Sequence, residues 1–368
     1  MEKIRLGDII KYEQPTKYIV LSENYLEDGE YPVLTAGKSL LLGRSNNFNE
    51  IYTKLPVIIF DDFTCASKFV NFPFVVKSSA MKMLQPATKS VDLKYIFYYL
   101  QKLNYMPTNH KRHWISKFAS FELNLPNFKE QQKIVAELDS LSDIIEKKKE
   151  QLKELDNLSQ SLFHEMFGDI ERNEKGWELN TINNVCTSIV RGPFGSSLKK
   201  DFFVKPSVST YKVYEQKNAI KKNSEIGSYY VTEGKFNELK RFECKPNDII
   251  MSCSGTMGEL YQLPNNIEKG IINQALCKFT LNNKILPVFF LKFLKNNILK
   301  LESRGSGIKN IAAVSFIKRI KIPVPPMELQ NEFANRVETI DKQKDLINKS
   351  LVEVQTLFDS RMQKYFGE

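Results

Sequence analysis

The chain lacks the features that mark membrane and secreted proteins. Its longest strongly apolar runs, at 55–60 and 286–294, fall short of the ~18–20 residues that a membrane span needs. The N-terminus shows no apolar stretch followed by a small-residue cleavage site. The 5 cysteines are scattered and form no C-x-x-C pair, which fits a reducing compartment better than a disulfide framework. We therefore expect a cytoplasmic protein that contacts no membrane.

Catalytic and cofactor motifs are also missing. The GKS at 37–39 resembles the end of a P-loop, but Pro32 stands where the leading glycine belongs. The S-x-x-K at 79–82 has none of the companion motifs that give it meaning in enzymes. His110 and His113 lie three residues apart without the further ligands that a metal site needs. The sequence thus favours binding over catalysis, with no cofactor in this chain.

What the chain does have is length for two domains and an uneven distribution of charge. Its 368 residues, 42% hydrophobic and 26% charged, suit two folded domains. The net charge of +10 is divided into +4 over 1–128, −4 over 129–169, +12 over 170–327 and −2 over 328–368. A polyanion should therefore contact the first and third segments rather than the second and fourth.

The two acidic segments are predicted to be long helices. Neither glycine nor proline occurs within 129–167 or 328–366. Pro126 precedes the first run and Gly168 follows it, while Gly367 follows the second, so start and stop signals agree. Each helix of roughly 36 residues is ~54 Å long, which exceeds the width of a small domain. Most of each helix must therefore find its partner outside its own domain.

Apolar residues in both helices follow a heptad pattern typical of a coiled coil. The seam positions are Leu138, Leu141, Ile145, Leu152, Leu155 and Leu162 in the first helix and Val337, Ile340, Ile347, Leu351, Val354 and Phe358 in the second. Lys148 and Lys344 interrupt the two seams and help to fix register. We expect the two helices to pair antiparallel, because the segments that carry them are joined head to tail.

The chain is an internal duplication. An offset of 199 relates the two helices and also maps Ser116 to Ser315, Pro126 to Pro325, Gln131 to Gln330 and Leu158 to Leu357. Towards the N-terminus the offset falls in steps to 195 at 78–84, 191 at 56–60, 180 at 31–37 and 176 at 5–10. Insertions in the second copy explain this drift, so the globular parts diverged while the helices stayed in step.

Each globular copy is predicted to be mixed α/β (α+β). Short β-branched and aromatic runs such as LPVIIF, FVNFPFVV, DIIMSC and KGIINQ are separated by turn residues and predict strands. Helices are predicted near the end of each copy, at 92–103 and 287–301. The aromatic residues of these two helices recur at helical spacing, so we interpret them as core rather than as base-stacking platforms.

Basic and polar loops supply candidate nucleic-acid contacts. In the second copy these are Arg191, Ser196, Ser197, Lys199, Lys200, Gln216, Lys217, Asn218, Arg304, Ser306, Lys309 and Asn310. In the first copy they are Lys38, Arg44, His110, Lys111, Arg112 and His113. For each one, a solvated loop residue is an equally good interpretation. Together with the segregated charge, the set favours DNA.

The whole chain resembles the specificity subunits of type I restriction-modification systems. The resemblance rests on the two variable copies, on the helix starts LNLPNFKEQQKIV and IKIPVPPMELQNEF, and on stretches such as PVIIFDDFT, RGPFGSSLKK, SCSGTMGE and GSGIKN. It implies target recognition domains at 1–128 and 170–327, each reading half of an asymmetric bipartite DNA site. It further implies spacer helices at 129–169 and 328–368 that dock two modification subunits.

The resemblance also implies which chemistry the partners supply. S-adenosylmethionine and methyl transfer belong to the modification subunits, and ATP- and magnesium-dependent translocation and cleavage to restriction subunits. The alternative from another class is a non-catalytic coiled-coil scaffold whose basic domains bind protein or RNA. Retention of one duplex from a random pool discriminates between the two, because a scaffold selects nothing.

Overall fold

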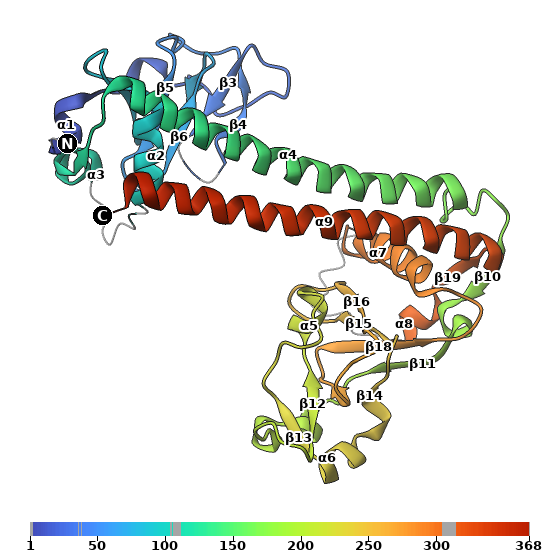
Figure 1. Cartoon of the computed structure of the whole chain (residues 1–368). Helices are drawn as coiled ribbons and strands as arrows, with labels where there is room; N and C mark the ends of the chain where they lie inside the picture. Colours follow the sequence, from blue (N-terminus) through green and yellow to red (C-terminus); the bar gives the residue numbers. More distant parts are fainter. Residues whose placement is uncertain are drawn as a thin grey trace. The chain divides into compact units, whose positions relative to one another are not determined.

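The computed structural model describes residues 3–35, 37, 39–103, 105, 112–303 and 314–367, with only the backbone described for 298–303. Internal contacts divide the chain into two compact units, one formed by Met1–Gln151 with Ile347–Glu368 and the other by Leu152–Leu346. Each unit contains one globular copy and one half of each long helix (Figure 1). The boundary between units 1 and 2 therefore falls inside both helices.

Unit 1 contains three sheets. Its elements are β1 (Lys3–Arg5), α1 (Leu6–Ile9), β2 (Ile10–Glu13), η1 (Thr16–Tyr18), β3 (Tyr31–Leu34), β4 (Leu41–Ser45), β5 (Val57–Asp61), β6 (Ser67–Val70), β7 (Val75–Val76), β8 (Met81–Pro86), α2 (Leu93–Leu103), α3 (His113–Ser116), η2 (Phe118–Ser120) and β9 (Glu122–Asn124). The sheet orders are β2-β8-β5-β6, β4-β3-β7 and β1-β9. On β5, Ile58 and Phe60 face the core that contains α2, while Val57 and Ile59 face the core beneath β3. This period of two is the expected pattern of a strand buried on both faces.

Unit 2 repeats this plan with more elements. They are β10 (Glu178–Thr181), η3 (Ile182–Val185), β11 (Cys186–Arg191), η4 (Gly195–Leu198), η5 (Lys200–Phe202), β12 (Thr210–Tyr214), α5 (Gln216–Ile220), β13 (Tyr230–Thr232), α6 (Glu233–Glu238), η6 (Lys240–Phe242), β14 (Glu243–Cys244), β15 (Ile249–Ser252), β16 (Leu260–Gln262), β17 (Gly270–Ile272), β18 (Leu276–Leu281), α7 (Pro287–Ser303), α8 (Val314–Arg319) and β19 (Lys321–Val324). The sheet orders are β11-β18-β15-β16, β13-β12-β17-β14 and β10-β19.

Strand register confirms the predicted duplication. Ile58↔Leu84 corresponds to Ile249↔Phe279, Val33↔Val75 to Val213↔Ile271, and Lys3↔Asn124 to Leu179↔Pro323. These pairs reproduce the offsets of 191 and 195, of 180, and of 176 and 199 that the sequence indicates, and they add an offset of 196 between Val75 and Ile271. The predicted helices near the end of each copy are α2 and α7. Their aromatic residues are buried in the cores, as expected, except for Phe97, which is half-buried.

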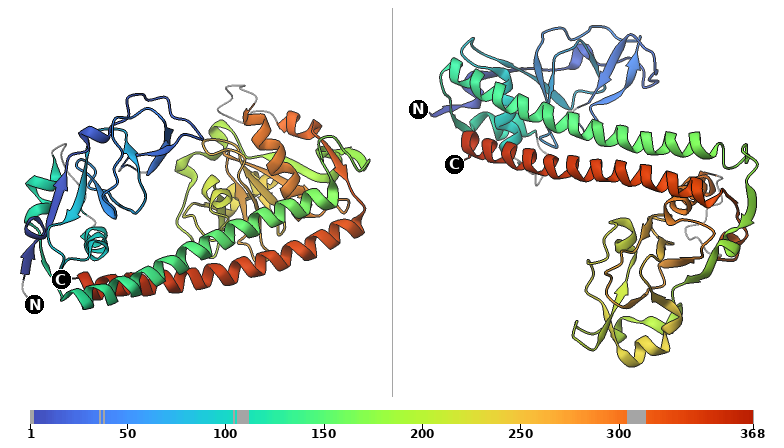
Figure 2. Two further views of the ribbon diagram at one scale, coloured as in Figure 1. Left: turned by 90° about the horizontal axis from the view of Figure 1, so that it is seen from above. Right: turned by 45° about the vertical axis from the view of Figure 1, so that its right-hand side comes forward.

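The two long helices are α4 (Phe128–Phe167) and α9 (Met327–Phe366), each of 40 residues. In unit 1, Glu137 near the start of α4 accepts a hydrogen bond from Tyr365 near the end of α9. In unit 2 the relation is reversed, because Phe163 of α4 packs against Phe333 of α9 with ring centroids 5.5 Å apart. The helices are therefore antiparallel, as Figures 1 and 2 show. Within the part of the chain that the structure describes, every helix is too short or too polar to form a membrane span.

None of the predicted seam residues is exposed. Leu138, Ile145, Leu162, Val337 and Ile340 are buried, and Leu141, Leu152, Leu155, Ile347, Leu351, Val354 and Phe358 are half-buried. Lys344, which interrupts the seam, forms an ion pair of 2.6 Å with Asp156 of α4 in unit 2. The hydrogen bond from Lys344 lowers the pKa of Asp156. The lysine thus pairs across the two helices with a carboxylate whose ionised form it favours.

A buried glutamine ties the start of each long helix to its own copy. Gln131 is fully buried, and its Nε2 donates to the carbonyls of Ser90 (3.0 Å) and Pro126 (2.8 Å). Its Oε1 accepts from the backbone N–H of Asp92 at 2.8 Å. The equivalent bonds of Gln330 reach the carbonyls of Lys284 (3.2 Å) and Pro325 (2.8 Å) and the N–H of Leu286 (2.8 Å). The two helix starts are therefore built in the same way.

Candidate nucleic-acid interface

In unit 2, four loops meet where two parallel strands end. β12 ends at Tyr214 and β17 at Ile272, and the strands pair in parallel. The N–H of Asn273, just after β17, donates to the carbonyl of Tyr214 at 2.9 Å. The loops at 192–194 and 252–258 lie beside these strand ends. The N–H of Gly192 donates to the carbonyl of Leu276, and the N–H of Cys253 donates to the carbonyl of Ala275. Segments distant in sequence therefore present one continuous surface.

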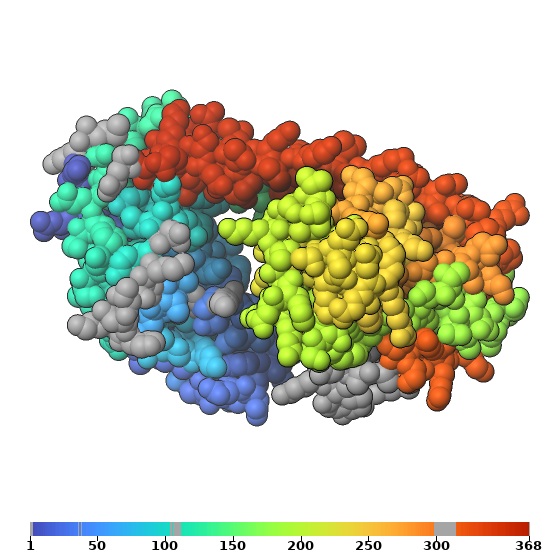
Figure 3. All heavy atoms as spheres, turned by 90° about the horizontal axis from the view of Figure 1, so that it is seen from below, coloured from blue at the N-terminus to red at the C-terminus, as the bar shows by residue number. Residues whose placement is uncertain are grey.

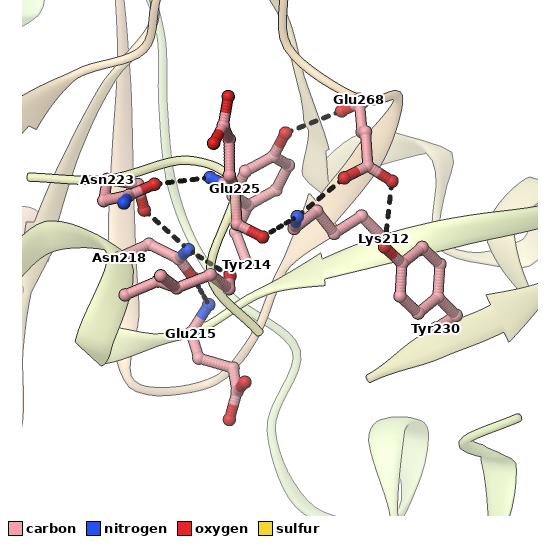
Figure 4. A network of polar contacts seen from close by, with 9 residues as sticks. Lys212, Tyr214, Glu215, Asn218, Asn223, Glu225, Tyr230 and Glu268 are labelled. Atoms are coloured by element: carbon pink, nitrogen blue, oxygen red, sulfur yellow. Dashed lines mark hydrogen bonds and ion pairs between the residues drawn. The ribbon is translucent and has the colours of Figure 1, made fainter. Parts of the chain in front are cut away.

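A polar network behind these loops fixes the end of β12 (Figure 4). The side chain of Lys212 is 1% exposed, and its Nζ donates to Glu268 Oε1 (2.7 Å) and to the carbonyl of Glu225 (2.8 Å). The Tyr230 hydroxyl donates to Glu268 Oε2 at 2.9 Å. Burial alone raises the pKa of Glu268, but the hydrogen bonds from Lys212 and Tyr230 outweigh it and lower that pKa. The buried ammonium group thus keeps an ionised partner at neutral pH.

Asn218 belongs to this framework rather than to the surface, which corrects its prediction as a DNA contact. It is fully buried in α5, and its Nδ2 donates to the carbonyls of Asn223 (2.9 Å) and Ile226 (2.8 Å). Its Oδ1 accepts from the N–H of Glu215 at 2.7 Å, which closes a capping box at the helix start. These bonds use both amide donors, so Asn218 has none left for a base edge.

Gln216 holds the neighbouring loop at 252–258. Its Nε2 donates to the carbonyls of Ser254 and, at 3.1 Å, Thr256. Between them, Gly255 has a φ of +61°, a conformation that favours glycine. Gly255 and Thr256 are exposed, while Gln216 is half-buried. The amide donors that were predicted to read a base are therefore used to position this loop tip.

The basic loop after β11 is largely exposed. Ser196, Lys199 and Lys200 are exposed, and Ser197 and Arg191 are half-buried. Residues around 200–250, lime to yellow in Figure 3, form much of the visible surface of unit 2. Lys217 adds a further cation, although it forms an ion pair of 2.7 Å with Glu215. Four cationic residues and two hydroxyls predicted as contacts thus lie at or near the surface of one unit.

The described candidates of unit 1 are less open. The Arg44 side chain donates to the carbonyls of Gly29 and, at 2.7 Å, Glu30. His113 is 3% exposed, its ring packing against that of Tyr105 with centroids 5.7 Å apart, so it is core and not the predicted surface contact. Arg112 is exposed. Lys38, His110, Lys111, Arg304, Ser306, Lys309 and Asn310 lie outside the described residues.

Sequence reasoning missed one prominent member of this surface. Phe194 lies in the same loop as Arg191 and is 59% exposed. The sequence does indicate this exposure, because Pro193 and Gly195 on either side of Phe194 predict a turn, and turns lie at the surface.

Comparison with known proteins places this geometry in a family. The family model described as type I restriction modification DNA specificity domain matches residues 1–156 and 174–356. The specificity subunit of type I restriction enzyme EcoR124I/EcoR124II of Escherichia coli is 47% identical over 131 residues, which are 34% of this chain and 32% of that protein. The MjaVIII specificity subunit of Methanocaldococcus jannaschii is 30% identical over 141 residues, again 34% and 32%. The matches therefore span about a third of these relatives.

Two solved structures resemble the whole chain in fold. The S subunit of a type I restriction-modification system from M. genitalium has a TM-score of 0.61 at 16% identity, over 100% of this chain and 96% of that one. A chain from a study of complex assembly and conformational transition of the type I R-M system has a TM-score of 0.56 at 15% identity, over 99% and 97%. At such low identity these likenesses concern the fold alone.

Proposed function

The chain belongs to the family of type I restriction-modification DNA specificity domains, and we propose that it is the non-catalytic specificity subunit of such a complex. In this proposal each globular copy reads one half of an asymmetric bipartite DNA target. The paired helices α4 and α9 set the distance between the two half-sites. Methyl transfer and cleavage are carried out by partner subunits.

One observation carries the proposal: the two copies share strand register but differ in the loops that the shared frame presents. The loop after β5 is organised by Asp61, whose Oδ1 accepts from the N–H groups of Phe63 and Thr64 at 2.8 Å. The equivalent loop after β15 is held instead by Gln216. One frame with two different surfaces is the expected design of a protein that reads two different sequences.

The charge supports DNA as the ligand of both copies. The segments that carry the globular copies are basic, whereas those that carry the helices are acidic. Phosphate contacts supply most of the affinity of DNA-binding proteins, and base contacts supply the selectivity. Acidic helices make few such contacts, which suits a spacer that other proteins bind.

Two equivalent grooves support a partner that binds twice. The first, of about 690 Å³, is lined by Pro86, Ala87, Val91 and Phe128 among others, and the second, of about 640 Å³, by Leu281, Asn282, Ile285 and Met327. These residues correspond pairwise between the two copies, at offsets of 195, 195, 194 and 199. Both grooves adjoin the start of a long helix. We assign them to the two modification subunits, because surfaces that read different DNA have no reason to keep the same groove.

Docking at these grooves is tested by stoichiometry. Phe128→Glu should reduce the number of modification subunits bound per chain from two to one, as should Met327→Glu, and the double variant should bind none. Phe72, which is 40% exposed elsewhere in unit 1, supplies the matched control Phe72→Glu. Binding of two subunits by the double variant, measured by native mass spectrometry, would remove the grooves from the interface.

The function itself is tested by selection from random DNA. The full chain, bound to its modification subunits, is incubated with a pool of random duplexes, and the retained molecules are sequenced. The proposal predicts one enriched motif made of two defined blocks separated by an undefined gap. Retention without any motif would contradict it and would favour a scaffold that binds protein or RNA.

A further inference from the structure

Phe194 is an aromatic residue that the fold holds at the surface of unit 2. At 59% it is the most exposed aromatic residue among the described part of the chain, ahead of Phe316 at 51%. It lies between Pro193, which is buried, and Gly195, whose φ is +62°. The turn therefore points the ring outward while its neighbour is anchored. An exposed aromatic ring on a basic surface offers a face on which a nucleic-acid base can stack.

The backbone that carries the Phe194 ring is held rigidly. The N–H of Gly192 donates to the carbonyl of Leu276 at 2.9 Å, which ties the loop to β18. A Cβ at Gly192 would lie only 1.9 Å from the carbonyl oxygen of Asn273, so only glycine allows this close approach. Proline then fixes φ for the residue that precedes the aromatic ring. Gly192 and Pro193 together therefore hold in place the backbone that carries Phe194.

The surroundings of the ring are cationic. The Arg191 guanidinium group lies 4.9 Å from the centroid of the Phe194 ring, and its Nε also donates to the carbonyl of Gln274 at 3.4 Å. Lys199 and Lys200 follow within six residues and are exposed. An apolar ring among cations matches the chemistry of nucleic acid, in which apolar base faces alternate with phosphates. It does not match the core of a protein interface, where charged residues are depleted.

We propose that Phe194 is a wedge that inserts between neighbouring base pairs of the DNA target, while Arg191 supports the ring and the two lysines hold the flanking phosphates. This inference rests on the proposed function, because it needs bound duplex DNA. Aromatic and aliphatic wedges of this kind partly unstack a base step and kink the duplex. Specificity then arises also from how easily the target sequence unstacks at that step.

The test uses the full chain with its modification subunits and a duplex recovered by selection. Fluorescent base analogues, 2-aminopurine for adenine and pyrrolocytosine for cytosine, replace one base at a time, so that every base pair is sampled. Both analogues brighten when they unstack. The wild-type complex should brighten at one step severalfold, and Phe194→Ala should abolish that signal and weaken binding by about ten-fold. Phe194→Trp should retain it.

The matched control is Phe202→Ala. Phe202 is an exposed aromatic residue in the same segment, but Lys235 Nζ lies 4.1 Å from its ring centroid and covers it. This variant should keep both the unstacking signal and the affinity. Undiminished brightening with Phe194→Ala, an equal loss with both variants, or no brightening at any position of the wild-type complex would each overturn the wedge. A chain that selects no duplex at all would instead contradict the proposed function.

Discussion

Phe366, the last residue of α9, packs against Tyr95 of the first globular copy, with ring centroids 5.0 Å apart. At the equivalent place in unit 2, the ring of Phe167, the last residue of α4, lies 4.7 Å from that of Phe289. Each long helix therefore starts on its own copy and ends in the core of the other. Neither unit is complete without the helix that the other copy contributes.

This exchange predicts that each helix end stabilises the opposite copy. Phe167 is fully buried, so Phe167→Ala should cost about 3–5 kcal/mol in unit 2. Phe366 is half-buried, and Phe366→Ala should cost less, about 1–3 kcal/mol in unit 1. Unit 1 contains Trp114 and unit 2 contains Trp177, so urea unfolding of single-tryptophan variants reports each unit separately.

The tryptophan whose unfolding transition shifts shows which unit a substitution destabilises. Phe366→Ala should shift the Trp114 transition, although residue 366 belongs by sequence to the second copy. A shift confined to Trp177 would show that the end of α9 does not pack in unit 1.

Removing the buried glutamine at a helix start should be costly. Gln131→Ala leaves the N–H of Asp92 and the carbonyls of Ser90 and Pro126 without their partner, at about 1–3 kcal/mol for each group that stays buried. The neighbouring Gln132 is exposed, so Gln132→Ala should stay within about 0.5 kcal/mol of wild type. The measurement is the free energy of unfolding in denaturant. Equal values for the two variants would show that the three hydrogen bonds contribute nothing to stability.

Neutralising the exposed lysines of the basic loop should change the salt dependence of DNA binding. Each phosphate contact contributes about 0.9 to the slope of log K against log salt concentration. Lys199→Gln with Lys200→Gln should therefore reduce the slope by about 1.8 and weaken binding to all sequences alike. An unchanged slope in titrations from low to high salt would remove these lysines from the interface.

Acid should loosen the network around Lys212. The pKa of Glu268 is lowered in the folded state, so its ionised form contributes stability above its unfolded pKa of about 4.3, and this stability is lost as pH falls through the lower folded value. Glu268→Gln should therefore be less stable than wild type at pH 7, with the difference shrinking below about pH 4.3. Urea midpoints measured across this range test the sign, and a difference that grew in acid would contradict it.

The arrangement of strands and helices was predictable from the sequence, because the duplication relates the two copies by a small set of residue offsets. Every offset read from the sequence reappears in strand register, and none of the predicted seam residues is exposed. Glycine-free helices and alternating strands depend on local patterns, which a single sequence displays. Equivalent positions in two copies then check one another.

Side-chain roles were less predictable, because they depend on partners distant in sequence. Asn218 and Gln216 are polar residues beside a lysine, and nothing local distinguishes a buried cap from a base reader. The same holds for the core: Lys82 and Asp62 form a buried ion pair of 3.0 Å in unit 1, whereas Cys277 and Cys253 occupy the equivalent positions in unit 2. Such exchanges alter the polarity of a core without altering the fold.

The central claim is that two different readers are held apart by α4 and α9, and changing the length of the helices tests it most directly. Four residues inserted after Gln151 and four after Leu346, where α4 and α9 pass from one unit to the other, should lengthen the pair by ~6 Å, at 1.5 Å per residue. At ~3.4 Å per base pair, the recognised motif should gain one or two base pairs in its gap while both half-site sequences stay the same. The methylated motif of cells that carry either form, together with the partner subunits, gives the answer. An unchanged gap in a folded, active complex would contradict the claim.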